Sequence, residues 1–321
     1  MAMKKFISTY RTQLSVLAVM MFLLIIFAAM NPRVFLSYTT YRSLFTVYPI
    51  ALFLACGLVF TVSSGEADLS FPATVGITLW VFARVTVSTG YPFLGLFCAI
   101  LVGVLVGFVN GILITKVKLS SLVVTLGMNF LLRGLINVGT QGLGIPLVFL
   151  NRTPFFNIFV GRIGGFPVQM LWGLAFIVVC LFLYNRHRFG AHVRYAGDNR
   201  QSAVETGVKA DRVKIGAFML VGFASAMAGV FVGLINNTFW PTTGEGYLLT
   251  SMAAVYLGGT PTWGGVGTIM GAALGAFILT FLETGIIAVG FSGFYTSFFF
   301  GLILILALIS HRFSSMKRKG G

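Results

Sequence analysis

Long apolar runs separated by short polar segments dominate the chain. Residues 14–30 contain no ionisable side chain, and comparable runs recur to the end of the sequence. A helix needs about 20 apolar residues to cross the hydrocarbon core of a bilayer. The pattern therefore predicts an all-α, polytopic membrane protein with about ten transmembrane helices. We expect them over residues 13–30, 45–63, 69–89, 92–115, 121–139, 168–184, 214–236, 245–263, 265–288 and 292–310.

The regular pattern is broken in two places. Residues 64–70 put two carboxylates, Glu66 and Asp68, between apolar segments. Residues 247–257 form a helix-like run that is only about half a membrane long, and Gly- and Pro-rich residues 258–265 follow it. We expect a half-helix continued by extended backbone. Membranes tolerate such backbone only where it is buried in protein or lines a cavity, so the breaks indicate a transport path.

The two breaks share a short sequence echo. Ser64-Gly65-Glu66 precedes one predicted helix, and Thr243-Gly244-Glu245 precedes another. The predicted topology places them on opposite faces of the membrane, as a possible inverted repeat requires. Glycines at four-residue intervals, Gly103, Gly107 and Gly111, predict close helix packing, either inside the subunit or at a dimer seam.

The composition and charge fit this topology. The chain is 57% hydrophobic and 9% charged, with a formal charge of +15, whereas soluble proteins carry about 25% charged residues. Most Lys and Arg residues fall in segments that the threading places on one side, which predicts cytoplasmic N- and C-termini. These segments contain Lys4, Lys5 and Arg11; Lys116 and Lys118; Arg186, Arg188, Arg194, Arg200, Lys209, Arg212 and Lys214; and Arg312, Lys317, Arg318 and Lys319. The basic charge is a topology signal, and nucleic acid is not needed as a partner to explain it.

Polar residues near the breaks are candidates for lining the path. Glu66 and Asp68 are ionisable groups near a membrane span, where such groups are usually functional; Asp68 can instead cap the following helix. Asn129 and Arg133 lie on a polar strip of one span, which either packs against other helices or forms a wall for a hydroxylated solute. The candidate substrate-pathway set is Glu66, Asp68, Ser70, Asn129, Arg133, Glu245 and Thr260.

The segment 190–212 mixes small residues with charges of both signs. Pure anchoring to lipid would favour uninterrupted Lys and Arg, so a short helix over 201–207 with mixed charge suits docking to another protein. A solvated loop is the alternative. The candidate coupling residues are Gly197, Asp198, Asn199, Ala203, Glu205 and Gly207. We expect residues 1–321 to form a single transmembrane domain that contains this coupling region.

Motifs for catalysis are absent from the sequence. No Gly-x-x-x-x-Gly-Lys-[Ser/Thr] phosphate loop occurs, and neither a Ser/His/Asp nor a metal-ligand constellation is evident. Cys56, Cys98 and Cys180 fall in apolar spans and suit packing. We therefore expect a transport subunit, not an enzyme, with no cofactor or metal of its own. Any energy from ATP must come from a partner.

The sequence resembles the permeases of ribose-type and related monosaccharide ATP-binding-cassette importers. The matching residues run through nearly the whole chain in order: Asp68-Leu69-Ser70, Asn110-Gly111, Thr125-Leu126-Gly127-Met128, Arg133-Gly134, Phe189-Gly190, Ala196-Gly197-Asp198-Asn199, Ala203, Glu205-Thr206-Gly207-Val208, Gly244-Glu245-Gly246-Tyr247-Leu248, Ala253-Ala254-Val255-Tyr256-Leu257-Gly258-Gly259-Thr260 and Gly264-Gly265-Val266-Gly267.

The resemblance implies a bacterial inner-membrane permease and a set of partners. Two permease subunits, identical or paralogous, pair with two cytoplasmic ATPases that bind ATP and Mg, and a periplasmic or surface binding protein delivers the solute. Residues 197–207 correspond to the coupling helix. Where the family has Gly-Gly-Ile-Asp-Leu-Ser-Val-Gly, this chain reads Ser64-Gly65-Glu66-Ala67-Asp68-Leu69-Ser70-Phe71. Glu66 and the bulky Phe71 depart from the family pattern, and they leave the identity of the solute undecided.

We therefore expect the permease of an ATP-driven importer that passes a sugar or sugar-like solute by alternating access. One rival is a secondary transporter that couples transport to a proton at Glu66 and Asp68. The other is a membrane structural or assembly protein without transport.

Overall fold

The computed structural model describes residues 11–319, and most of their regular structure is α-helical. The helices are α2 (Arg11–Met30), α3 (Pro32–Phe35), α4 (Tyr38–Ser63), α5 (Phe71–Thr89), α6 (Pro92–Thr115), α7 (Ser121–Thr140), α8 (Pro154–Val160), α9 (Val168–Asn185), α10 (Arg188–Asp198), α11 (Arg200–Glu205), α12 (Ala210–Asn236), α13 (Tyr247–Leu257), α14 (Ile269–Ala288) and α15 (Phe294–Lys319). A 3-10 helix spans Val148–Arg152.

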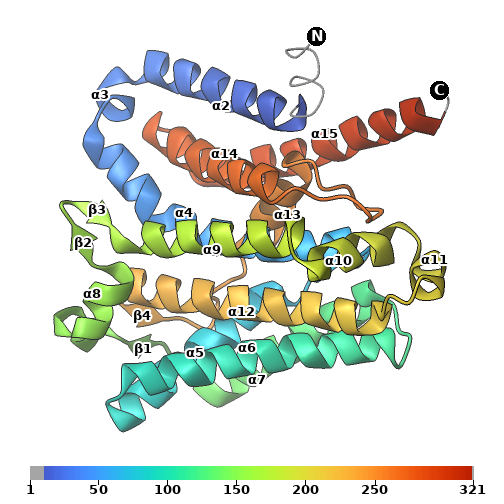
Figure 1. Cartoon of the computed structure of the whole chain (residues 1–321). Helices are drawn as coiled ribbons and strands as arrows, with labels where there is room; N and C mark the ends of the chain where they lie inside the picture. The colour runs from blue at the N-terminus through green and yellow to red at the C-terminus, as the bar shows by residue number, and fades with distance from the viewer. Residues whose placement is uncertain (1–10, 320–321) are drawn as a thin grey trace.

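Within the described residues, two small antiparallel strand pairs interrupt the helical fold. Strand β1 (Ile145–Pro146) pairs with β4 (Thr238–Phe239), and β2 (Arg162–Ile163) pairs with β3 (Phe166–Pro167). Together with α8 they lie at one end of the helical bundle, and α10 and α11 lie at the opposite end (Figure 1). We call these the α8 end and the α11 end. The start of α2 and the end of α15 lie toward the α11 end.

The helices confirm a polytopic membrane protein. Seven of them, α4, α5, α6, α7, α9, α12 and α14, are long and apolar enough to cross a membrane, and Met20–Met30, α13 and Phe294–Ala307 are shorter apolar helical stretches. Two boundaries differ most from the expected ones: α15 continues to Lys319 instead of ending at residue 310, and α4 begins at Tyr38 instead of at residue 45. The Ser37 hydroxyl accepts the Thr39 N–H at 3.3 Å and so caps an earlier start.

The half-helix expected over 247–257 is present as α13. The expected non-helical continuation follows it as residues 258–268, and a second non-helical stretch, residues 240–246, precedes it. The Cα of Gly258, directly after α13, lies against backbone of Gly271 in the first turn of α14. Helix α13 therefore reaches the α11 end, and residues 258–268 form a loop there. The left-handed backbone at Gly259, Gly264 and Gly265 shapes that loop.

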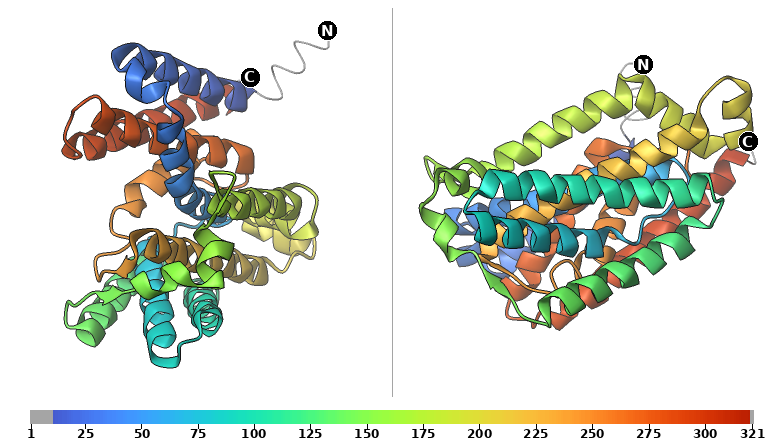
Figure 2. Two further views of the ribbon diagram at one scale, coloured as in Figure 1. Left: turned by 90° about the vertical axis from the view of Figure 1, so that its left-hand side faces the viewer. Right: turned by 90° about the horizontal axis from the view of Figure 1, so that it is seen from below.

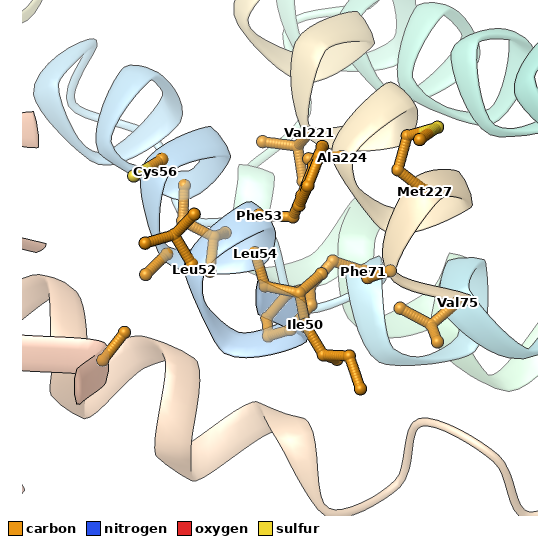
Figure 3. Close-up of a cluster of buried hydrophobic side chains, with 14 of the residues drawn as sticks. Ile50, Leu52, Phe53, Leu54, Cys56, Phe71, Val75, Val221, Ala224 and Met227 are labelled. Atoms are coloured by element: carbon orange, nitrogen blue, oxygen red, sulfur yellow. The ribbon is translucent and has the colours of Figure 1, made fainter. Parts of the chain in front are cut away.

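Helix α12 lies at the centre and packs against α4, α5 and α6 (Figures 1 and 2). The core between α4 and α12 is apolar: Phe53 of α4 faces Val221 and Ala224 of α12, and Phe71 and Val75 extend it onto α5 (Figure 3). All five are nearly inaccessible to solvent. This packed middle holds the ends of the helices, where the functional residues lie, in fixed positions.

The glycine spacing of α6 serves packing inside the subunit. A side chain at Gly103 or Gly107 would collide with the backbone carbonyl groups of Gly222 or Phe218 on α12, and one at Gly111 would collide with Ile215. Small residues at four-residue intervals therefore let α6 and α12 approach backbone to backbone. Of the two explanations left open by the sequence, packing within one chain is confirmed for this ladder.

Candidate functional site

The first break, residues 64–70, follows α4 at the α11 end and leads inward to α5. The N–H groups of Ser64 and Glu66 bond back to the last turns of α4, and the backbone beyond them needs other partners. The N–H of Ala67 donates to the Ser121 hydroxyl at 3.3 Å, and the N–H of Leu69 donates to the Thr125 hydroxyl at 3.0 Å. The polar strip of α7 thus supports the break.

Asp68 is a buried cap at the start of α5. One of its carboxylate oxygens accepts the Ser70 N–H at 2.8 Å and the Ser70 hydroxyl at 2.6 Å, and the Asn110 amide donates to that hydroxyl at 2.8 Å. Asp68 is only 2% exposed, and Ser70 is equally inaccessible. Asp68 and Ser70 therefore brace the break from inside the protein.

The non-helical stretch before α13, residues 240–246, leads from the α8 end into the bundle. From here on, we call these residues the second break. Arg133 of α7 holds it: the guanidinium donates to the carbonyl oxygens of Pro241 at 2.9 Å and Thr243 at 2.8 Å. The same group donates to the Pro72 carbonyl of α5 at 3.2 Å. Gly244, with φ of 97°, packs against that carbonyl so closely that no side chain fits. The second break therefore packs against the first turn of α5, directly after the first break, and Arg133 joins the second break to α5.

Three of the predicted pathway residues share a partly open face beside this contact. Asn129 lies one turn before Arg133 on α7, both are partly exposed, and Glu245 is exposed in the second break. The carbonyl oxygen of the Asn129 side chain is buried and has no hydrogen-bond partner among the described residues. Such a face can offer donors and acceptors to hydroxyl groups.

The other predicted pathway residues do not join this face. Thr260 is fully buried, and its hydroxyl accepts the Thr268 N–H at 3.2 Å, so it braces the loop after α13. Asp68 and Ser70 are buried as described above. Glu66 lies at the α11 end, where its carboxylate pairs with Lys214 of α12 at 2.5 Å.

The predicted coupling segment touches the first break directly. The N–H of Gly265 donates to the Ser63 carbonyl at 2.9 Å, and a side-chain carbon at Gly197 would meet that carbonyl and the Gly265 nitrogen. A side-chain carbon at Gly264 would lie 2.8 Å from the Gly197 oxygen and 2.9 Å from the Gly65 Cα. We call Ser63, Gly65, Gly197, Gly264 and Gly265 the glycine junction. It joins the end of α4, the end of α10 and the loop after α13.

Hydrogen bonds between side chains reinforce the glycine junction. The Tyr184 hydroxyl donates to the Ser63 hydroxyl at 2.9 Å, and the Ser63 hydroxyl donates to the Val266 carbonyl at 3.2 Å. Arg194 of α10 donates to the Tyr184 carbonyl at 2.6 Å and lies over the Tyr184 ring. Helices α9 and α10 are thereby tied to the same point.

The remaining coupling residues build α11 and its ends. The Asn199 side chain accepts the Ser202 N–H at 3.1 Å and caps the helix, and Ala203 is buried beneath it. Glu205 is exposed, and Gly207 has φ of 86° with open space around its Cα. Asp198 lies beside Gly265. The predicted helix over 201–207 is present at 200–205, and α10 was not predicted.

Sequence reasoning also missed several residues that the site needs. Ser63, Tyr184 and Arg194 stand at the ends of apolar runs or in a basic segment, where nothing marks them. Lys214 could have been recognised as a site candidate from the sequence, because it is a charged residue that continues the helical pattern of the following span. Its burial and its pairing with Glu66 depend on a contact across 148 positions, which no local pattern reveals.

Interrupted helices whose backbone groups are held by side chains, inside a bundle of membrane-spanning helices, are typical of a membrane transporter. Residues 40–308 match the family described as "Branched-chain amino acid transport system / permease component". The chain belongs to this family. It is a multi-pass membrane permease of the bacterial ATP-binding-cassette importer class, and members of that class are non-catalytic transport subunits.

Relatives with assigned functions are similar over nearly their whole lengths. The chain is 32% identical to the ribose import permease protein RbsC of Bacillus subtilis (strain 168), over 90% of this chain and 89% of the relative. It is 28% identical to the ribose import permease protein RbsC of Escherichia coli (strain K12), over 91% of each. It is 32% identical to the autoinducer 2 import system permease protein LsrC of Yersinia pestis (strain Pestoides F), over 96% of this chain and 86% of the relative. No solved structure matches the chain.

Proposed function

We propose that this permease passes a sugar or sugar-like solute into the cytoplasm by alternating access, driven by a separate ATPase. The observation that carries the proposal is the contact between the coupling segment and the first break at the glycine junction. Family membership and the names of the ribose and autoinducer 2 relatives support the solute class. The face formed by Asn129, Arg133 and Glu245 suits a neutral, hydroxylated molecule that must not be bound tightly.

In this proposal the α11 end faces the cytoplasm, and the start of α2 and the end of α15 lie toward it. The basic segments around α10 and α11 are at this end, in agreement with the positive-inside rule. The helical backbone of α15 carries Arg312 and Lys317 toward the same end. Lys4 and Lys5 lie outside the described residues. The α8 end then faces the exterior and receives the solute.

The two breaks support an inverted repeat. The first enters the bundle from the α11 end and leads to α5, whereas the second enters from the α8 end and leads to α13. The second packs against the first turn of α5, directly after the first, through the contact between Gly244 and Pro72. In transporters built this way, one repeat rocks against the other around a fixed site. This contact is the proposed centre of that movement.

Coupling to ATP follows from the exposed side of α11. A partner ATPase can bind Glu205 and its exposed neighbours, and any movement of α10 and α11 is passed to Ser63 and to the loop after α13. Because backbone packs on backbone at the glycine junction, little movement is lost in flexible side chains. ATP and Mg bind to the ATPase in this scheme, and this chain supplies only the mechanical connection.

The proposal includes further partners. A periplasmic or surface binding protein delivers the solute to the α8 end, and a second copy or a paralogue of the permease covers the open face of Asn129, Arg133 and Glu245, which one chain leaves partly exposed. Residues 1–321 act as a single transmembrane domain in the surrounding lipid, with residues 190–212 as its coupling region. Nucleic acid has no role.

The proposal is tested with the permease in proteoliposomes together with its ATPase and binding protein. ATP hydrolysis is measured with the binding protein alone and with the binding protein plus ribose, other pentoses, hexoses, polyols or a furanose signal molecule. At least one sugar-like solute should stimulate hydrolysis. Absence of stimulation by every solute, in a complex that assembles, would contradict the proposed function and favour a structural role.

A further inference from the structure

Glu66 and Lys214 form a poorly exposed ion pair between the first break and α12. The Lys214 ammonium lies 2.5 Å from a Glu66 carboxylate oxygen, and the two side chains are only 10% and 16% exposed. Two charges held away from water stabilise each other only while they stay together, since separation leaves an uncompensated charge in a poorly solvated place. The pair therefore favours conformations in which residues 64–70 lie against the start of α12.

The pair stands at a place where the coupling segment and the break converge. Lys214 is in the second turn of α12, and that helix follows α11 after four residues, 206–209. On the other side, Glu66 follows Gly65 of the glycine junction. A displacement of α11 relative to α4 therefore changes the separation of these two charges. The packing of the glycine junction transmits the movement of α11. The ion pair sets which relative position of the first break and α12 is preferred.

A cavity of about 210 Å³ adjoins the pair, and its lining contains other cations. Its lining residues are Glu66, Ile114, Thr115, Lys118, Arg200 and Lys214. Glu66 is the acidic member of this lining, beside three cations. Arg200 belongs to α11 and pairs with Asp211 at 2.7 Å. A carboxylate that leaves Lys214 can therefore remain near positive charge, which lowers the barrier to its movement.

We propose that Glu66 and Lys214 are positioning residues that latch the first break to α12 in the described conformation, and that the transport cycle requires the latch to open. The proposal rests on the proposed function, because it assigns a role within ATP-driven movement of the coupling segment. Glu66 leaves Lys214 when α11 moves, and the cavity and its remaining cations accommodate the carboxylate. The latch keeps ATP hydrolysis low until the binding protein has delivered solute.

The test uses charge exchange in the complete transporter with its ATPase and binding protein in proteoliposomes. The single variants Glu66→Lys and Lys214→Glu, and the exchanged pair E66K/K214E, are compared by the number of solute molecules imported per ATP hydrolysed. Each single reversal should raise solute-independent hydrolysis at least fivefold and lower import per ATP at least fivefold. The exchanged pair should return both values to within twofold of the unmodified protein.

Two further variants separate a latch from a purely structural pair. E66Q/K214M removes both charges without leaving either one unpaired, so it should fold even if the single reversals do not; the latch predicts that it is uncoupled. Lys116→Ala removes one partner of the exposed Lys116–Asp211 pair and should leave coupling unchanged. Normal coupling in a folded E66Q/K214M transporter, or failure of the exchanged pair to restore coupling, would overturn the latch.

The unmodified protein distinguishes this inference from the proposed function. If it shows no ATP-driven import, the proposed function fails whatever the variants do. If it imports solute and the folded charge variants retain its coupling, only the latch fails.

Discussion

Gly197→Ala tests the glycine junction with a single added carbon. That carbon would collide with the Ser63 carbonyl oxygen and would lie 2.8 Å from the Gly265 nitrogen. Both are backbone atoms, so neither can turn aside as a flexible side chain does. Overpacking of this kind destabilises by about 1–3 kcal/mol, whereas Ala in place of Gly inside a helix gains up to about 1 kcal/mol. We expect a net penalty of about 1–2 kcal/mol on the conformation with the junction closed, which is a factor of about 5 to 30 in its population.

The assay is import per ATP hydrolysed in proteoliposomes that contain the ATPase and binding protein. Gly197→Ala should insert and assemble, but its import per ATP should fall by about that factor, because movement of α10 no longer reaches Ser63 in register. Gly301→Ala is the matched control: it makes the same substitution within α15, where nothing lies within 4 Å of the added carbon. Unchanged coupling in an assembled Gly197→Ala transporter would refute the idea that close packing at the junction carries the movement.

Three further predictions concern docking, the break and the orientation. Glu205→Lys, which reverses an exposed charge of α11, should leave the permease in the membrane at normal levels but lower uptake; normal uptake would remove the docking role. Thr125→Val deprives the Leu69 N–H of its acceptor and should lower the free energy of unfolding by about 1–3 kcal/mol, measured by denaturation in mild detergent; an unchanged value would show that the break does not need α7. Orientation is tested with cysteine variants in a background without the native cysteines. A membrane-impermeant maleimide should label Tyr91→Cys from outside intact cells and leave Val204→Cys unlabelled, because both positions are exposed but lie at opposite ends of the bundle. The reverse labelling would show that the proposed topology is inverted.

Much of the helical fold is predictable from the sequence because the membrane imposes it. A span needs a long apolar run, and runs such as those of α6 and α7 end at polar or glycine-containing turns, so their boundaries follow from local pattern. The half-helix α13 is likewise visible, since glycines mark its end. The non-helical stretch before the helix, residues 240–246, was not predicted, because the guanidinium that binds two of its carbonyl groups belongs to Arg133, more than 100 positions away.

The candidate site was only partly predictable for the same reason. Polar residues near the breaks could be identified, but whether each faces the path or the interior depends on tertiary contacts. Asp68 and Thr260 have buried roles, whereas Asn129 and Glu245 lie on the open face. The predicted coupling segment rests on its mixed charge and on its family resemblance. Its contact with the first break required the structure.

The most direct test of this account is solute uptake into proteoliposomes with ATP supplied to the ATPase and with every ion gradient dissipated by ionophores. We predict uptake that requires ATP and the binding protein, and that is unaffected when proton carriers are added. Uptake that follows an imposed pH gradient without ATP, and that is lost in E66Q/D68N, would contradict the account and identify a proton-coupled carrier.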